Sequence, residues 1–269
     1  MKKFKYIWRE GIHGVFLTGV KFMRDFKLQI ENKQDFNTPV LYAAVHTNFH
    51  DVPVIMEAIK KHSYLLASDE VKGHISGLLF ESNGVVYIHR QDKESCKNAS
   101  NNVISTLKDG KSVLMFPEGT WNVTPSSPIL NLKWGFVDIA MNANVPIVPI
   151  VTEYLDDRCI IRFGEPIVID KNSFDSHQEY IEYKKQKLDE LEESLSTMKW
   201  DIWTQYGGTY NREDGDLNKK RLDKYKKEYS DIDYEYESQF IYNPVQYLED
   251  ICPINVVEVN QKKRTLTNK

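Results

Sequence analysis

The segment His46-Thr47-Asn48-Phe49-His50-Asp51 places a histidine and an aspartate five positions apart. A regular helix would turn them away from each other, because five residues rotate the chain about 140° beyond one full turn. A turn after a strand can instead fold the two side chains together, and a carboxylate on one imidazole nitrogen leaves the other nitrogen as a base. The simpler interpretation is that Asp51 caps a helix whose first turn contains Pro53, while His46 is an ordinary turn residue.

His46 and His50 are also four positions apart, as in some zinc-binding helices. The sequence has no HExxH motif, and no third candidate ligand lies close by. We therefore expect no bound metal and no other cofactor.

A second segment, Phe116-Pro117-Glu118-Gly119-Thr120, follows an apolar run. Proline and glycine bend the chain sharply, which would present Glu118 at the end of a strand with backbone N–H groups turned outward. Such a bend suits the binding of a polyol or a phosphate. The simpler interpretation is a tight turn with an exposed glutamate.

Two more apolar segments carry residues with distinctive chemistry. In Gly84-Val85-Val86-Tyr87-Ile88-His89-Arg90, a strand would deliver Arg90 to its end, where the guanidinium could bind phosphate in a forked geometry or form a surface ion pair. The segment Val145-Pro146-Ile147-Val148-Pro149-Ile150 carries two prolines and suits an edge strand, the wall of an apolar groove, or the core.

These segments lie where short apolar runs alternate with helical stretches. We expect strands over residues 40–45, 64–67, 84–88, 113–116, 147–152 and 159–163, and helices over residues 52–61, 93–108 and 132–143. This alternation predicts an α/β fold with a central, mostly parallel sheet flanked by helices. The polar turns would then follow strand ends, where such folds place their sites.

The two ends of the chain differ from this core, which we assign to residues 38–172. We expect residues 1–37 to form an amphipathic helical segment, because seven basic and two acidic residues in the first 30 are interleaved with aromatic ones. It would lie in the headgroup region of an anionic bilayer or pack on the core. Residues 173–269 are expected to form a charged, helical C-terminal extension, with apolar residues at helical spacing from Ile181 to Met198.

Several classes of protein are disfavoured by the sequence as a whole. No segment has the roughly 18 consecutive apolar residues of a membrane-spanning helix, and Lys21 follows a short apolar run where a signal peptide needs small residues. Three distant cysteines without a CxxC motif indicate reduced thiols in a cytoplasmic protein. A net charge of −4 and a pI near 6.0 give no reason to expect nucleic acid as a partner.

The order of the four segments is more specific than any one of them. HxxxxD, then GxxxIxR, FPEGT and VPIVPI, over residues 46–150, resembles the four sequence blocks of the glycerolipid acyltransferases, the family of lysophosphatidic acid acyltransferases. Lys133-Trp134-Gly135 and Arg162-Phe163-Gly164-Glu165-Pro166-Ile167 also look like features of that family. The resemblance covers roughly residues 38–170.

The resemblance implies transfer of a fatty acyl group from acyl-CoA or acyl-carrier protein to a hydroxyl group of a lysophospholipid such as lysophosphatidic acid. His46 would be the general base and Asp51 would orient it. The acceptor oxygen would attack the thioester directly, and the sequence has no GxSxG motif for an acyl-enzyme. Substrate binding would fall to Arg90, Glu118, Gly119, Thr120 and Lys133. The protein would act as a peripheral protein on the cytoplasmic face of the membrane, where its lysolipid acceptor resides.

The chain departs from the family pattern at two places. Val45 stands where the family usually has asparagine, and Trp121-Asn122 stands where arginine and serine often follow FPEGT. Losing that arginine removes a cation, although Lys133 could replace it. A lysolipid with another headgroup, a glycolipid or an aminolipid therefore stays open as the acceptor. Two further hypotheses are a non-catalytic lipid-binding relative and a lipid hydrolase.

Overall fold

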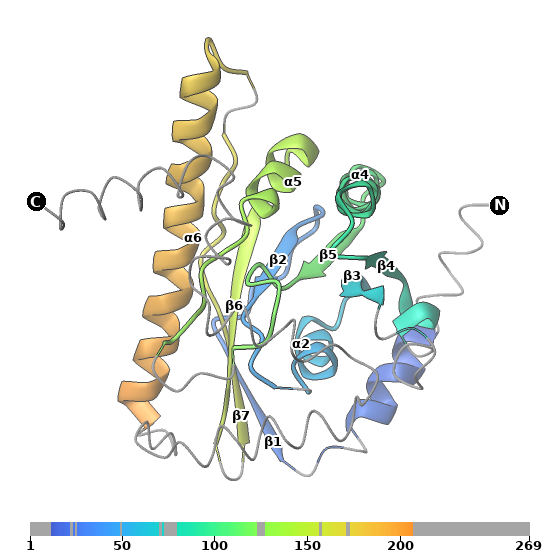
Figure 1. Ribbon diagram of the computed structural model, residues 1–269. Coiled ribbons are helices and arrows are strands. Elements are labelled where there is room, and N and C mark those ends of the chain that lie inside the picture. The colour runs from blue at the N-terminus through green and yellow to red at the C-terminus, as the bar shows by residue number, and fades with distance from the viewer. Residues whose placement is uncertain are drawn as a thin grey trace, which may run out of the picture.

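The computed structural model describes residues 12–21, 24, 26–48, 50–69, 72, 80–122, 127–155, 158–170 and 173–206. In this part of the chain, seven strands form one sheet in the order β1-β7-β6-β2-β5-β3-β4 (Figure 1). Every neighbouring pair is parallel except β6 with β7. The predicted α/β class with a mostly parallel sheet is confirmed. The strands are β1 (Lys27–Glu31), β2 (Leu41–Ala44), β3 (Ser63–Ser68), β4 (Val85–Ile88), β5 (Ser112–Met115), β6 (Ile147–Tyr154) and β7 (Arg158–Phe163).

Helices cover both faces of this sheet (Figure 1). Helices α4 (Lys93–Lys108), α5 (Gly135–Ala143) and α6 (His177–Tyr206) share one apolar core, and α2 (Asp51–Ile59) and a helix over residues 12–21 share the other. Alternate residues of β2 enter the two cores, Leu41 the first and Tyr42 the second. A strand that is covered on both faces has no polar side, which explains the continuous apolar run predicted there.

Helix α4 has the predicted bounds because both of its ends are encoded locally. The side chain of Asp92 accepts a hydrogen bond from the backbone N–H of Glu94 and caps the first turn. The chain leaves the helix through Asp109 and Gly110, and Gly110 has a φ of 82°, a left-handed conformation that glycine adopts without strain.

One element prediction was wrong, and one open alternative is decided. Residues 27–31 lie in the segment expected to be helical but form the edge strand β1, whose half-exposed, mixed residues give a weak apolar signal. Of the alternatives for the segment that contains Pro149, the core is confirmed and the edge strand is excluded, because β6 is a central, buried strand. The carbonyl of Pro149 accepts the N–H of Gly164, just beyond the end of the β6–β7 ladder, and the nitrogen and carbonyl of a strand residue point the same way. The missing N–H therefore costs no bond toward β2.

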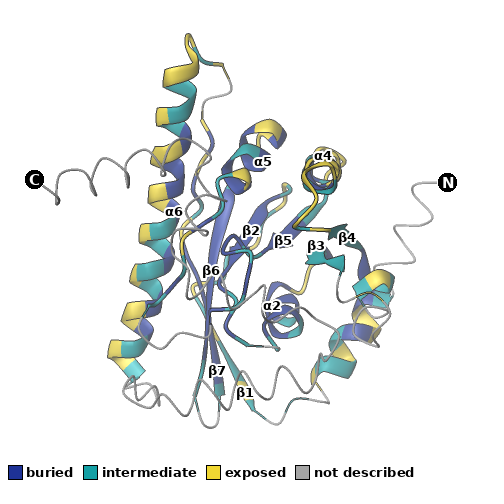
Figure 2. Cartoon of the chain, viewed as in Figure 1, coloured by how far each residue is buried: buried dark blue, intermediate teal, exposed yellow. Residues whose placement is uncertain are grey.

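The C-terminal extension begins as part of the core. Helix α6 buries Leu188, Leu191, Leu195 and Ile202 against the sheet and exposes its opposite face to solvent (Figure 2). Residues 1–11, which are basic and aromatic, and residues 207–269, which are charged, lie outside the described residues. The predictions made for them are therefore untested.

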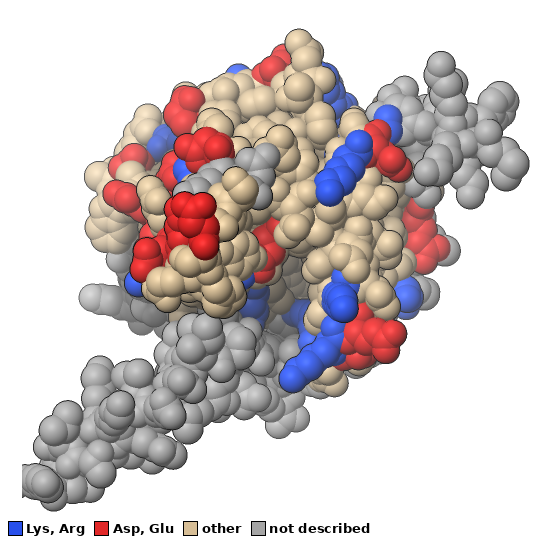
Figure 3. Space-filling view, turned by 90° about the horizontal axis from the view of Figure 1, so that it is seen from above, with Lys and Arg blue, Asp and Glu red and all other residues tan. Residues whose placement is uncertain are grey.

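The surface seen from the end where α6 begins carries charges of both signs (Figure 3). Acidic side chains predominate on the side of α6, basic and acidic ones are interspersed on the opposite side, and this face has no continuous basic stripe. Among the described helices, none is both long enough and apolar enough to cross a bilayer.

Candidate active site

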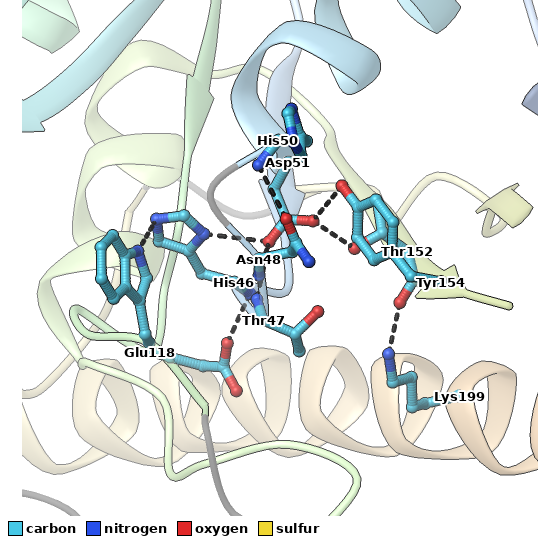
Figure 4. A network of polar contacts seen from close by, with 10 residues as sticks. His46, Thr47, Asn48, His50, Asp51, Glu118, Thr152, Tyr154 and Lys199 are labelled. Atoms are coloured by element: carbon cyan, nitrogen blue, oxygen red, sulfur yellow. Dashed lines mark hydrogen bonds and ion pairs between the residues drawn. The ribbon is translucent and has the colours of Figure 1, made fainter. Parts of the chain in front are cut away.

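The first predicted site forms at the carboxyl end of β2. His46 lies two residues beyond this strand, and its Nδ1 is 3.0 Å from Oδ2 of Asp51 (Figure 4). On the other side of the ring, the indole Nε1–H of Trp121 donates to Nε2 of His46. A carboxylate can only accept and an indole N–H can only donate, so the ring hydrogen is on Nδ1 and the lone pair is on Nε2. The imidazole is therefore in the tautomer that a base facing away from Asp51 requires.

Asp51 closes the turn that carries His46. It is the first residue of α2 and has no exposed surface. Its Oδ2 also accepts the backbone N–H groups of Thr47 and Asn48, at 2.6 and 2.7 Å. Because the N–H groups of Thr47 and Asn48 precede the helix, the carboxylate stabilises the turn before α2 and does not serve as a helix cap.

The other oxygen of Asp51 is held by β6. The hydroxyl groups of Thr152 and Tyr154 both donate to Oδ1, each at 2.9 Å (Figure 4). Burial by itself would raise the pKa of Asp51, but the hydrogen bond and charge of His46, together with the backbone N–H bonds, outweigh burial and lower this pKa. The carboxylate is therefore ionised at neutral pH and is held in one orientation against the imidazole.

Two aromatic rings enclose His46. Phe116 stacks on the imidazole with ring centroids 4.1 Å apart and an angle of 24° between the planes. Trp121 meets the imidazole edge-on, at 5.5 Å and 88°. The His46 side chain is 17% exposed, so a reactant can reach the ring only through a restricted opening.

Glu118 lies beside His46, but its carboxylate faces the protein interior. It has no exposed surface, and its oxygens accept the backbone N–H groups of His46 at 2.8 Å and Leu130 at 2.7 Å. The N–H of Asn122 bonds back to the carbonyl of His46 at 2.6 Å. Burial raises the pKa of Glu118 to about 7, although these N–H groups and the charge of Lys199 lower it. Direct contact between Glu118 and a substrate remains a prediction, and the burial of this side chain argues against it. In the structure, the carboxylate joins the loop of His46 to the loop of Leu130.

The remaining predicted residues meet at Gly119. This residue has a φ of 73°, and its carbonyl accepts a hydrogen bond from the guanidinium of Arg90. The side chain of Lys133 crosses directly above it, since a Cβ added to Gly119 would lie 3.1 Å from Lys133 Cε. Thr120 follows and is buried. The structure thus brings two cations, predicted from separate parts of the sequence, to one turn.

Sequence reasoning missed the support behind Asp51. Thr152 and Tyr154 alternate along β6, so both hydroxyl groups point to the same face, and polar residues with this spacing in an apolar strand were the available signal. Lys199 of α6 donates to the carbonyl of Thr152 and pairs with Glu153 at 2.6 Å, with both side chains 3% exposed. No local pattern connects residues 47 positions apart.

The histidine pair does not form a metal site within the described residues, where no group of three or more His, Cys, Asp or Glu side chains could hold an ion. The ring of His50 packs edge-on against Phe26, at 5.8 Å between centroids.

The sequence of this region matches that of known enzymes. Residues 27–153 match the profile of the family described as acyltransferase. This segment belongs to the acyltransferase family. It contains His46, Asp51, Arg90, Lys133 and the turn around Glu118, so every residue predicted to contact a substrate lies in the matched segment. The supporting residue Lys199 lies beyond it.

Individual members of the family are distant. The chain is 26% identical over 117 residues to lyso-ornithine lipid O-acyltransferase of Rhizobium meliloti, covering 44% of this chain and 39% of that one. It is 31% identical over 126 residues to 1-acyl-sn-glycerol-3-phosphate acyltransferase of Cocos nucifera, covering 46% and 40%. The chain thus spans about two fifths of the length of these relatives.

A solved structure shares the fold. The crystal structure of 1-acyl-sn-glycerophosphate acyltransferase PlsC from Thermotoga maritima superposes with a TM-score of 0.52, at 19% identity, over 71% of this chain and 81% of that one. This coverage exceeds that of the family segment, which fits the finding that α6 belongs to the core.

Proposed function

We propose that this protein is an O-acyltransferase that moves a fatty acyl group from acyl-CoA or acyl-carrier protein to a hydroxyl group of a lysophospholipid such as lysophosphatidic acid. The observation that carries the proposal is the state of His46. A buried, ionised carboxylate holds its Nδ1–H, and Nε2 has the lone pair. This is the arrangement of a general base.

In the proposed reaction, Nε2 of His46 accepts the proton of the acceptor hydroxyl while the hydroxyl oxygen attacks the thioester carbonyl carbon. The carbon–sulfur bond then breaks, and the proton passes from the imidazolium to the leaving thiolate. The Asp51 carboxylate stabilises the imidazolium between these steps. A base of this kind contributes typically about 10²–10⁴ in rate, so the positioning of both substrates must supply much of the remainder.

The two cations near Gly119 favour an acceptor that carries phosphate. We assign Arg90 and Lys133 to the acceptor headgroup, because both lie against the turn that follows β5. The planar, permanently charged guanidinium of Arg90 has a forked set of N–H donors that matches the geometry of a phosphate. Glu118 would act behind this turn as a positioning residue.

An aminolipid acceptor is the second candidate. It is favoured by the similarity to lyso-ornithine lipid O-acyltransferase and by Trp121, which stands where the family often has an arginine. Under either candidate the acceptor is a membrane lipid, so the protein would act at the cytoplasmic face of the membrane.

The test is acyl transfer by the purified protein from palmitoyl-CoA or palmitoyl-acyl-carrier protein to lysophosphatidic acid, lyso-ornithine lipid and other lysolipids, with products identified by mass spectrometry. His46→Ala and Asp51→Ala are the site variants, and Asp138→Asn, on the far side of the sheet, is the control. Equal rates for wild type and site variants would reject the mechanism. Liposome binding without transfer would indicate a lipid-binding protein, and release of fatty acid without an acceptor would indicate a hydrolase.

A further inference from the structure

Trp121 is hydrogen-bonded to Nε2 of His46, the atom that accepts the proton in the proposed reaction. Its indole N–H donates to Nε2, and the ring stands edge-on to the imidazole at 5.5 Å. A neutral imidazole has one acceptor lone pair, located here on Nε2. While the indole bond is made, the lone pair cannot receive a proton from any other donor.

The backbone around Trp121 is fixed, so only its side chain can leave this position without disturbing the site. Thr120 and Asn122 are 4% and 2% exposed, and the N–H of Asn122 is bonded to the carbonyl of His46. Rotation of the indole would free Nε2 and leave these contacts in place. Phe116 would still stack on the imidazole.

We propose, building on the proposed function, that Trp121 is a positioning residue that reserves His46 for the lipid acceptor: the indole occupies Nε2 until the acceptor hydroxyl replaces it, and water does not replace it efficiently. An acceptor lipid brings apolar surface that can pack on the displaced indole and offset the lost hydrogen bond, whereas water brings none. With either reactant, the O–H proton goes to Nε2, the new oxygen–carbon bond forms, the carbon–sulfur bond breaks, and the thiolate takes the proton. Water would yield free fatty acid, and the indole suppresses that outcome.

The discriminating quantity is the ratio of thioester hydrolysis to acyl transfer. Trp121→Phe keeps an aromatic ring but removes the N–H donor. We expect hydrolysis of palmitoyl-CoA without acceptor to increase about threefold to tenfold, the range corresponding to one net hydrogen bond, while transfer to the preferred lysolipid changes less. Trp200→Phe, the same substitution at a 52% exposed position of α6, should leave the ratio unchanged. If hydrolysis and transfer fall together in Trp121→Phe, the indole merely orients His46 and the proposal is wrong.

A second measurement does not depend on any acyl transfer, so it separates failure of this proposal from failure of the proposed function. Diethyl pyrocarbonate modifies unprotonated imidazole nitrogens, and peptide mass spectrometry can follow the modification of His46 alone. Modification of His46 should be faster in Trp121→Phe than in wild type or Trp200→Phe, even if the protein proves inactive as an enzyme. Equal rates in the three proteins would overturn the occupancy of Nε2.

Wild-type protein provides the remaining test if Trp121→Phe does not fold. The chain has five tryptophans, and nitrogen-15 spectra resolve their indole N–H signals. The signal that shifts in His46→Ala belongs to Trp121, and it should shift again when lysophosphatidic acid or lyso-ornithine lipid, whichever is the better acceptor, is added to wild type. A signal that stays in place at saturating acceptor contradicts displacement of the indole.

Discussion

Replacing Asp51 by asparagine isolates the charge of this residue from its hydrogen bonds. Three N–H donors converge on Oδ2, whereas two hydroxyl groups, which can rotate and accept, face Oδ1. An asparagine can therefore direct its oxygen to the N–H groups and its amide nitrogen to Thr152 and Tyr154. The turn should fold, and His46 should keep its hydrogen on Nδ1.

The expected loss is then electrostatic. Unit charges about 4 Å apart interact by about 4 kcal/mol at an effective dielectric constant of about 20, which corresponds to roughly 10³ in rate. The amide oxygen still accepts a neutral hydrogen bond, so this value is an upper limit. We expect Asp51→Asn to reduce kcat by about 10²–10³, and to leave KM nearly unchanged because the buried side chain cannot touch an acceptor.

The assay is the release of coenzyme A together with mass-spectrometric detection of the acylated lipid, with thermal unfolding of each variant measured in parallel. Asp51→Ala, which leaves all the donors unsatisfied, should lose both stability and activity. If Asp51→Asn retains activity within about threefold of wild type while His46→Ala is inactive, the carboxylate does not stabilise an imidazolium, and the electrostatic reasoning fails.

Three further predictions concern the surroundings of the dyad. Because burial raises the pKa of Glu118 from 4.5 to about 7, its ionisation opposes folding, and the free energy of unfolding should decrease between about pH 4.5 and pH 7 by up to roughly 1.4 kcal/mol per pH unit; denaturant titrations should show this slope in wild type and a flatter one in Glu118→Gln. Gly119→Ala should cost about 1–2 kcal/mol of stability, since its φ of 73° disfavours a side chain, and should raise KM for a phosphate-bearing acceptor by displacing Lys133, as steady-state kinetics with lysophosphatidic acid would show. Lys199→Met should destabilise the protein by about 3–5 kcal/mol in thermal or chemical unfolding, because it leaves Glu153 buried without its cation; a loss below about 1 kcal/mol would contradict the assigned pairing.

The sequence indicated which side chains lie close together better than it indicated which residues hold them in place. The spacing of His46 and Asp51 and the bend at Gly119 are local features, and parallel strand ends bring such features to one edge of a sheet. The role of Glu118 depends on burial between two loops, and a single sequence does not reveal burial of a charged residue in a turn. The sequence marked Trp121 only as a departure, because its bond to His46 crosses 75 positions of chain.

The same contrast holds for the fold. Strands that are buried on both faces, such as β2, produce apolar runs that the sequence displays directly. The edge strand β1 is half solvated and produces no such run, so it was assigned to a helical segment. Pro149 left both an edge strand and the core open, because proline lacks an N–H. Its missing N–H faces Gly164, just beyond the end of the β6–β7 ladder, so the residue fits a central strand.

The contacts of α6 show that the folded core extends beyond the segment that matches the family. The family segment ends at residue 153, whereas Lys199 neutralises Glu153 and four leucine and isoleucine side chains of α6 seal one face of the sheet. A polypeptide that ends at residue 172 would retain His46 and Asp51. It would, however, expose that face of the sheet to water and leave the buried carboxylate of Glu153 without its cation. Catalytic competence in this protein would therefore require a helix that contributes no reacting atom.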